Sequence, residues 1–225
     1  HDARAAKFHN IKFIGLYEHA ADVESLSKFC RTNSMTIVKN CMQISLWLMD
    51  NNGVVLIPAR YKSSRFPGKP LVDICGKTMI QRVYEQCVSA VGSQNVYVAT
   101  DSDDIESSVK GFSGNVIKTS ENCLTGTDRI AEANKALDYD FVVNVQGDEP
   151  LIKPSDIRKV INEKKKNQDK VICGYSRLDK AENQNNTNIP KVVINQKNEL
   201  IYISRSPVPQ SKNKSLKINY LKQVC

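Results

Sequence analysis

A short apolar run that leads into a basic loop most constrains the fold of this chain. Residues 54–57 read Val-Val-Leu-Ile without polar alternation, which predicts a strand buried on both faces. The run breaks at Pro58, and the loop that follows contains Gly68. Four cations lie in this loop: Arg60, Lys62, Arg65 and Lys69. A buried strand followed by a basic, glycine-containing loop is how α/β proteins present cations and backbone N–H groups to phosphates.

Strands and helices alternate after this run. Predicted strands cover 54–57, 95–100, 116–119, 141–145 and 171–175, with a hairpin at 192–195 and 200–204 and a last strand beginning near 220. Predicted helices cover 78–91, 103–110 with Asp101 as its cap, a segment around 130–137 and one that begins at Pro154. Repeated β-α-β units predict an α/β fold with three layers, α/β/α, around a mostly parallel sheet.

Three loops leave predicted strands at the same edge of that sheet, starting at Pro58, Asp101 and Gln146. Ligands of such sheets bind beyond the carboxyl ends of the strands, so the polar residues of these loops should converge. Asp148 follows a buried strand and a glycine, and it should face Arg60 and Lys69 across a cleft. A carboxylate opposite several cations suits a magnesium–triphosphate complex, because Mg²⁺ takes one or two carboxylates and phosphate oxygens.

Composition excludes several other classes of protein. The seven cysteines are scattered without a C-x-x-C pair, which argues against a zinc site or a secreted disulfide framework and favours a reducing cytoplasm. The apolar segment at 44–49 is too short to span a bilayer, and no secretory signal is visible, so we expect a cytosolic protein without a membrane partner.

The net charge of +8 permits a nucleic-acid partner but does not demand one. Part of the excess lies on one predicted helix face and just beyond it, at Lys159, Lys164, Lys165, Lys166 and Lys170. No aromatic platform is interleaved with these lysines, so we interpret them as a solvated face and expect no nucleic-acid partner.

Four motifs, in order and spacing, resemble one enzyme family. They read IPARYKSSRFPGKPL from Ile57, VATD from Val98, TGTDRIAEA from Thr125 and VNVQGDEP from Val143. The chain closely resembles the 3-deoxy-manno-octulosonate (KDO) cytidylyltransferases, also called CMP-KDO synthetases. The resemblance implies a glycosyltransferase-A-like nucleotidyltransferase fold. It also implies an activity that joins CTP to the sugar acid KDO and releases pyrophosphate, for lipopolysaccharide or surface polysaccharide synthesis.

The resemblance also implies roles for individual residues. Arg60 and Lys69 would hold the triphosphate and stabilise the leaving pyrophosphate, with Arg65 assisting. Pro58 and Ala59 would place backbone groups against the cytosine. Four residues would close over the nucleotide: Thr125, Gly126, Thr127 and Arg129. Gln146 would contact the ribose or the sugar, Arg205 the sugar-acid carboxylate, and Asp148 would ligate Mg²⁺.

Both ends of the chain carry expectations of their own. We predict a domain boundary near Met49, with residues 1–48 as the remnant of an upstream domain plus linker and 49–225 as the cytidylyltransferase domain. Residues 1–28 resemble the end of a haloacid-dehalogenase-type phosphatase. No G-V-D-T-P-E-like segment with the family's second metal-binding aspartate is present, so we expect the C-terminal part of the domain to be missing. The complete protein is expected to be a homodimer.

Two alternatives to a KDO enzyme stay open from the sequence. One is a cytidylyltransferase for another acid sugar of the sialic-acid type, which a panel of sugar acids would distinguish. The other is a non-catalytic remnant that binds nucleotide, which would show stabilisation by CTP without turnover.

Overall fold

The computed structural model describes residues 48, 52–62, 66–179, 181–212 and 218–224. Residues 1–28, which resemble the end of a phosphatase, and Arg65 therefore lie outside the described residues. The chain divides after Asn162 into two compact units. Helix α7 (Pro154–Lys166) runs across this division.

A parallel sheet of four strands forms the centre of the first unit. Its order is β5 (Val116–Lys118), β4 (Val96–Thr100), β1 (Gly53–Ala59) and β6 (Phe141–Asn144). Every residue of β1 is buried, as the apolar run predicted. Val55 pairs with Val96 on one side and with Val143 on the other, so β1 has a parallel neighbour along both edges. The four strands predicted here are confirmed, each within about two residues.

The predicted break at Pro58 was wrong, because β1 continues through Ala59. Pro58 pairs with Ala99 of β4. The Leu56 carbonyl accepts a hydrogen bond from the Val145 N–H on the opposite side, where the pairing to β6 ends. Pro58 lies two residues further on and faces that same side. The N–H that proline lacks is therefore not needed by a neighbour, which is the condition for proline inside a strand.

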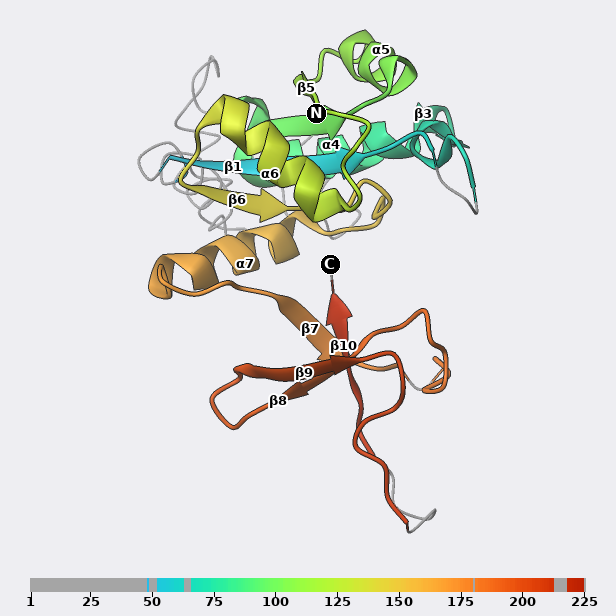
Figure 1. Cartoon of the computed structure of the whole chain (residues 1–225), viewed down its shortest axis with the longest axis vertical. Helices are drawn as coiled ribbons and strands as arrows, with labels where there is room; N and C mark the ends of the chain where they lie inside the picture. The colour runs from blue at the N-terminus through green and yellow to red at the C-terminus, as the bar shows by residue number, and fades with distance from the viewer. Residues whose placement is uncertain (1–47, 49–51, 63–65, 180, 213–217, 225) are drawn as a thin grey trace, which may run out of the picture. The chain divides into compact units, whose positions relative to one another are not determined.

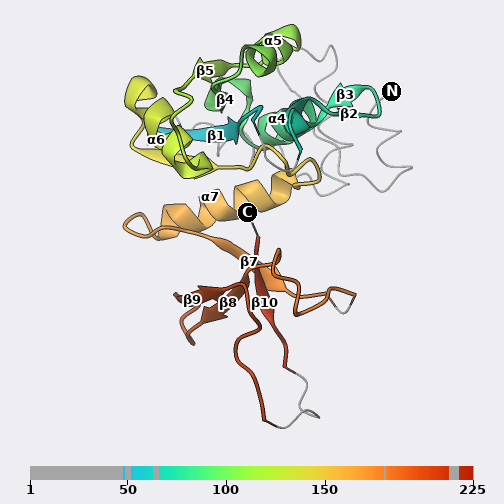
Figure 2. The same cartoon turned by 45° about the vertical axis from the view of Figure 1, so that its right-hand side comes forward.

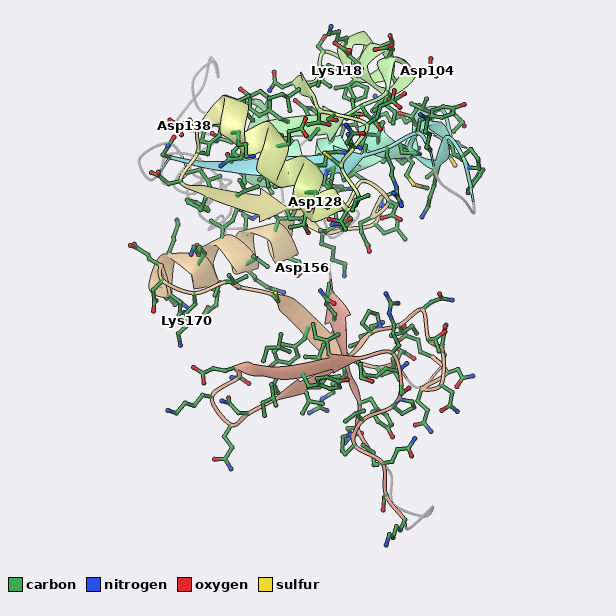
Figure 3. All side chains as sticks on the ribbon, viewed as in Figure 1. Asp104, Lys118, Asp128, Asp138, Asp156 and Lys170 are labelled. Carbon is green, nitrogen blue, oxygen red and sulfur yellow. The ribbon has the colours of Figure 1, made fainter. Side chains whose placement is uncertain are left out.

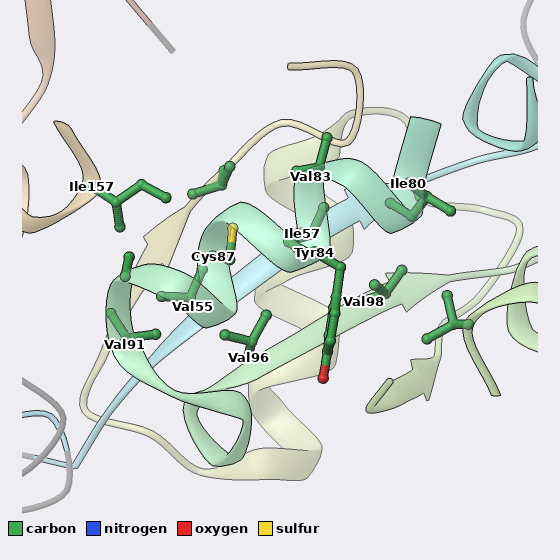
Figure 4. Close-up of a cluster of buried hydrophobic side chains, with 14 of the residues drawn as sticks. Val55, Ile57, Ile80, Val83, Tyr84, Cys87, Val91, Val96, Val98 and Ile157 are labelled. Carbon is green, nitrogen blue, oxygen red and sulfur yellow. The ribbon is translucent and has the colours of Figure 1, made fainter. Parts of the chain in front are cut away.

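Apolar side chains alternate between the two faces of β1 and build a separate core on each. Val55 and Ile57 pack with helix α4 (Met79–Val91) in the larger core, drawn in Figure 4. That core also takes residues from helix α5 (Asp103–Gly111) and from α7. Val54 and Leu56 pack with helix α6 (Gly126–Leu137) in the smaller core. The sheet thus lies between helices on both faces, with β1 between α6 and α4 in Figures 1 and 2.

The helix ends follow from local hydrogen bonding. Thr78 caps α4 by accepting a bond from the Gln81 N–H, and Gly92, with φ of 86°, ends it as predicted. The predicted cap of α5 was wrong by one residue. Ser102 accepts the bond from the Ile105 N–H, and the Asp101 carboxylate pairs with Arg129 instead. A serine suits this position as well as an aspartate, because both offer a side-chain acceptor to the first turn.

Short elements complete the first unit. The 3₁₀ helix η2 (Lys69–Leu71) follows the basic loop, and strands β2 (Asp73–Ile74) and β3 (Lys77–Thr78) form a small hairpin. A second 3₁₀ helix, η3 (Ser93–Asn95), leads into β4.

The second unit contains an antiparallel sheet in the order β7, β10, β8, β9. Its strands are β7 (Gly174–Arg177), β8 (Lys191–Ile194), β9 (Leu200–Ser204) and β10 (Leu221–Val224). The predicted hairpin is confirmed as β8 and β9. The strand predicted at 171–175 begins three residues before β7 does. Strand β7 begins at Gly174 because this residue pairs with Val224, at the end of β10. Val171 is exposed instead.

Lysines of the predicted basic face engage nearby acceptors. Lys159 and Lys166 of α7 pair with the acidic residues three positions earlier, Asp156 and Glu163. Lys170 pairs with Glu199 in the second unit. Among the described helices, none is long and apolar enough to cross a membrane.

We predict that Cys87 resists thiol reagents while the protein is folded. Its side chain is fully buried in the core around α4, and burial raises the pKa of the thiol to about 12. Because the thiolate is the reactive form, a maleimide at pH 8 should label the exposed Cys75 and Cys173 within minutes and leave Cys87 unmodified. Mass spectrometry of the digested protein measures this. Labelling of Cys87 at the rate of Cys75 without denaturant would contradict the described core.

Candidate functional site

A cavity of about 470 Å³ opens where β1 and β6 end. We call it the β1–β6 pocket, and these residues line it: Pro58, Ala59, Arg60, Phe66, Lys69, Pro70, Cys123, Thr125, Gly126, Arg129, Gln146, Gly147 and Asp148. They come from four separate stretches of the sequence, all within the first unit.

The strand order explains the position of the β1–β6 pocket. From β1 the chain moves to β4 and then β5 on one side, and it returns to the other side of β1 to form β6. The strand order therefore reverses between β1 and β6, and the pocket lies beyond the carboxyl ends of these neighbouring strands. Open α/β sheets bind their ligands at such a reversal of strand order.

A glycine in the basic loop fixes the backbone next to Lys69. Gly68 has a φ of 71°, in the left-handed region, and its N–H donates to the Tyr61 carbonyl at 2.9 Å. Its position as the cap of η2 requires this conformation, which glycine adopts without a steric cost. Lys69 follows directly as the first residue of η2, so its backbone is held by the turn while its side chain reaches into the pocket.

One ion pair joins two sides of the β1–β6 pocket. The Lys69 ammonium lies 2.6 Å from the Oδ2 atom of Asp148, which follows β6. Both side chains keep considerable exposure, 39% for Lys69 and 48% for Asp148. The sequence predicted that these residues would face each other across a cleft, and the structure brings them into direct contact.

The carboxylate next to Asp148 titrates unusually. Burial first, and then the neighbouring charge of Asp148, raise the pKa of the Glu149 carboxyl, while Lys69 opposes this shift. The loop after β6 thus carries a second, less exposed acid next to Asp148 in the sequence, although Glu149 is not among the residues that line the pocket.

A third side of the pocket is the first turn of α6. Thr125 and Asp128 form a reciprocal capping box, in which each side chain accepts a bond from the backbone N–H of the other. Asp128 and Asp138 lie at opposite ends of this helix (Figure 3). A Cβ atom on Gly126 would lie 3.3 Å from the Pro58 ring, so the helix approaches the end of β1 closely.

A buried ion pair ties α6 to the end of β4. Arg129 is 3% exposed and Asp101 10% exposed, and the guanidinium lies 3.1 Å from the Asp101 Oδ2 atom. The same guanidinium donates to the Thr119 hydroxyl after β5. The second oxygen of Asp101, Oδ1, is buried and has no hydrogen-bond partner among the described residues. Arg129 therefore lines the pocket, but its positive charge is neutralised by Asp101.

Nine of the predicted site residues line the β1–β6 pocket: Pro58, Ala59, Arg60, Lys69, Thr125, Gly126, Arg129, Gln146 and Asp148. Thr127 lies in the first turn of α6 but is not among the lining residues, and Arg65 lies outside the described residues. Arg205 belongs to the second unit, where its guanidinium donates to the Thr187 carbonyl at 3.0 Å. The ligand contacts of all these residues stay predictions.

Four lining residues were missed by the sequence reasoning: Phe66, Pro70, Cys123 and Gly147. Three of them lie inside motifs that were quoted for other residues, so their position in the motif was the available signal. Cys123 lies two residues before the TGTDRIAEA motif, and its thiol donates to the carboxylate of Glu132 in α6, at 3.2 Å. Nothing in the local sequence distinguished it from the other cysteines.

Residues 54–224 match the sequence profile of the family described as cytidylyltransferase. The chain belongs to this family. It is 47% identical over 164 residues to 8-amino-3,8-dideoxy-manno-octulosonate cytidylyltransferase of Shewanella sp. (strain W3-18-1), in a match that covers 70% of this chain and 66% of that protein. It is 39% identical over 174 residues to 3-deoxy-manno-octulosonate cytidylyltransferase of Escherichia coli, with coverages of 77% and 70%.

A solved cytidylyltransferase structure has the same fold. It is described as CMP:2-keto-3-deoxy-manno-octonic acid synthetase complexed with CTP, and it is 39% identical to this chain with a TM-score of 0.70. The match covers 77% of this chain and 71% of that one. The family and the nucleotidyltransferase fold predicted from the four motifs are confirmed. The family match begins at residue 54, and the domain boundary near Met49 stays a prediction.

We predict that breaking the buried pair destabilises the first unit. Asp101→Asn removes the charge that neutralises the buried Arg129 guanidinium, and the free energy of unfolding should fall by about 3–5 kcal/mol. Urea unfolding followed by circular dichroism measures the loss. The control is Asp103→Asn, in which the lost carboxylate pairs with Lys118 but is 95% exposed, and its unfolding curve should match that of the unchanged protein. Equal effects of the two substitutions would contradict the described burial.

We predict that Gly147 cannot be replaced by alanine without a loss of stability. A Cβ atom at this position would lie 2.8 Å from the Pro58 carbonyl oxygen, so the end of β1 or the loop after β6 would have to move. We expect Gly147→Ala to lower the free energy of unfolding by about 1–3 kcal/mol. Gly111→Ala is the matched control, because a Cβ atom there meets nothing within 4 Å, and it should keep or slightly raise the stability. Differential scanning calorimetry compares the two.

Proposed function

We propose that this chain carries the nucleotide-binding site of an enzyme that joins CTP to 3-deoxy-manno-octulosonate (KDO) and releases pyrophosphate. The observation that carries the proposal is the gathering of three of the four family motifs around one cavity that contains Arg60, Lys69 and Asp148. The fourth motif, VATD, is tied to this cavity through the ion pair of Asp101 with Arg129. The relatives named above support the choice of substrates. The chain spans 66% of the length of the Shewanella relative, so the activity of the whole protein belongs to this proposal.

The proposed reaction needs positioning and charge neutralisation more than covalent chemistry by the protein. The anomeric hydroxyl oxygen of the sugar attacks the α-phosphorus of CTP, its proton is lost, and the bond from that phosphorus to the bridging oxygen breaks. Pyrophosphate leaves with the electron pair. Arg60 and Lys69, assisted by Arg65, hold the β- and γ-phosphates and stabilise the charge that develops on them.

The other residues of the proposed site orient the nucleoside. Backbone groups of Pro58 and Ala59 contact the cytosine, and Thr125, Gly126 and Thr127 close over the nucleotide from the first turn of α6. Arg129 acts with them by fixing that turn through its pair with Asp101. Gln146, which donates to Asn144 at 3.0 Å, contacts the ribose or the sugar.

Magnesium fits the carboxylate of Asp148 in this pocket. No cluster of three or more histidine, cysteine, aspartate or glutamate side chains forms a metal cage in the described part of the chain. Asp148 is an exposed carboxylate in a pocket suited to phosphates, and Mg²⁺ commonly takes one or two protein carboxylates and completes its shell with phosphate oxygens and water. When bound, the ion neutralises phosphate charge. Asp148 would hold it, with Glu149 next to it in the sequence.

The sugar acid needs a cation for its carboxylate, and we assign this role to Arg205. Its guanidinium is exposed and donates through one nitrogen, Nη1, to the Thr187 and Asn188 carbonyls at 3.0 and 3.3 Å. Arginine can offer a further pair of donors to a carboxylate. A cytoplasmic location, a homodimeric complete protein and a role in lipopolysaccharide synthesis are part of the same proposal.

A second candidate substrate is the 8-amino analogue of KDO. One observation favours it: the match at 47% identity is to an 8-amino-3,8-dideoxy-manno-octulosonate cytidylyltransferase. The two sugar acids share the anomeric centre and the carboxylate, and they differ at the far end of the molecule. The same roles for Arg60, Lys69 and Arg205 apply to both.

Pyrophosphate release tests the proposal. The protein is incubated with CTP, Mg²⁺ and one sugar acid at a time: KDO, its 8-amino analogue or sialic acid. We expect release with one or both octulosonates and none with sialic acid. Lys69→Ala should lower the rate by roughly 10²–10³, because it removes one contact to the developing charge. Lys62→Ala is the matched control, since Lys62 lies in the same loop and pairs with Glu121 instead, and it should keep the rate.

Other outcomes separate the alternatives. Release with sialic acid alone would replace the octulosonate assignment with another acid sugar. A rise in melting temperature with CTP, without release on any sugar acid, would identify a non-catalytic nucleotide-binding chain. If Lys69→Ala keeps both pyrophosphate release and CTP binding, the β1–β6 pocket is not the nucleotide site and drops out of the proposal.

A further inference from the structure

The ion pair between Lys69 and Asp148 joins two residues that the proposed function assigns to different ligands. Lys69 is assigned to phosphates and Asp148 to a divalent cation, yet in the structure the ammonium nitrogen lies 2.6 Å from the carboxylate oxygen Oδ2. A metal ion would approach the same carboxylate. A cation bound there and the Lys69 ammonium would repel each other and compete for the oxygen.

The pair is built so that it can open. Both side chains are partly exposed, at 39% and 48%, so water can replace either partner and the pair itself is worth little. The backbone of Lys69 is held on both sides, by the left-handed Gly68 and by the bond from the Val72 N–H to the Lys69 carbonyl. Opening therefore needs only a rotation of the four-carbon side chain of Lys69, without movement of the loop.

We propose that Lys69 blocks Asp148 against divalent cations in the free protein and leaves it when phosphates enter the β1–β6 pocket. The cation and the nucleotide then bind together, because the phosphates give the ammonium an alternative partner and Asp148 becomes available. This inference rests on the proposed function and adds to it a coupling between the binding of the cation and the binding of the nucleotide. The coupling is reciprocal, so a cation at Asp148 raises the affinity of the pocket for phosphates by the same factor.

Manganese binding without nucleotide tests the inference. Electron paramagnetic resonance of free Mn²⁺ gives the dissociation constant for the unchanged protein and for Lys69→Met, Lys62→Met and Asp148→Asn. Lys69→Met removes the competing charge and should tighten Mn²⁺ binding by about three- to tenfold, an effect that shrinks as salt is added. Lys62→Met is the matched control: it removes a lysine of the same loop that pairs at the same distance, 2.6 Å, with Glu121, and it should leave the constant unchanged. Asp148→Asn should weaken binding in every background.

The outcomes separate this inference from the proposed function. If Asp148→Asn weakens Mn²⁺ binding but Lys69→Met does not tighten it, the blocking role is overturned while the metal role of Asp148 stands. If Asp148→Asn changes nothing, both are overturned. Equal tightening by Lys62→Met and Lys69→Met would also overturn the inference, because it would reduce the effect to a change in net charge. Circular dichroism and the melting temperature check that each variant is folded. We expect this because the substituted side chains are partly or largely exposed.

Discussion

The pairing of β1 with a parallel strand along each edge is the constraint on which the first unit depends. Because β4 and β6 occupy both edges and helices cover both faces, β1 must be apolar along its whole length, and it is buried throughout. Each fully buried valine, leucine or isoleucine contributes about 1.5–3 kcal/mol relative to exposure, so this strand is a large part of the core. The same arrangement places the carboxyl ends of β1 and β6 side by side, and the pocket lies beyond them.

Much of this unit could be predicted from the sequence because its signals are local. The apolar run from Val54 fixes a strand, the spacing of Val83, Cys87 and Val91 fixes a helix, and Gly92 marks where that helix ends. Ligands of parallel sheets bind beyond the carboxyl ends of the strands, and this rule predicts that Arg60, Lys69 and Asp148 lie close together, as they do around the pocket. The family resemblance added the roles, which geometry alone does not give.

What could not be predicted depended on partners distant in the sequence. Pro58 stays in its strand only because the pairing to β6 has ended, and β7 begins where β10 can pair with it. The resemblance implies that Arg129 closes over the nucleotide, but the sequence did not indicate that Asp101, 28 positions earlier, neutralises its charge in a buried pair. In each case the local residues allowed two structures, and a residue from another element decided between them.

The second sheet has a consequence for how the chain is made. Strand β10 lies between β7 and β8, although it follows both in the sequence. As the ribosome releases the chain, the parallel sheet has all four strands once Asn144 has emerged, and it can form while synthesis continues. Strand β7 can pair with β10 only after more than forty further residues have been synthesised beyond Arg177. The hairpin of β8 and β9 can close early, but β7 joins it only through β10, so the two units should acquire their structure at different times during translation.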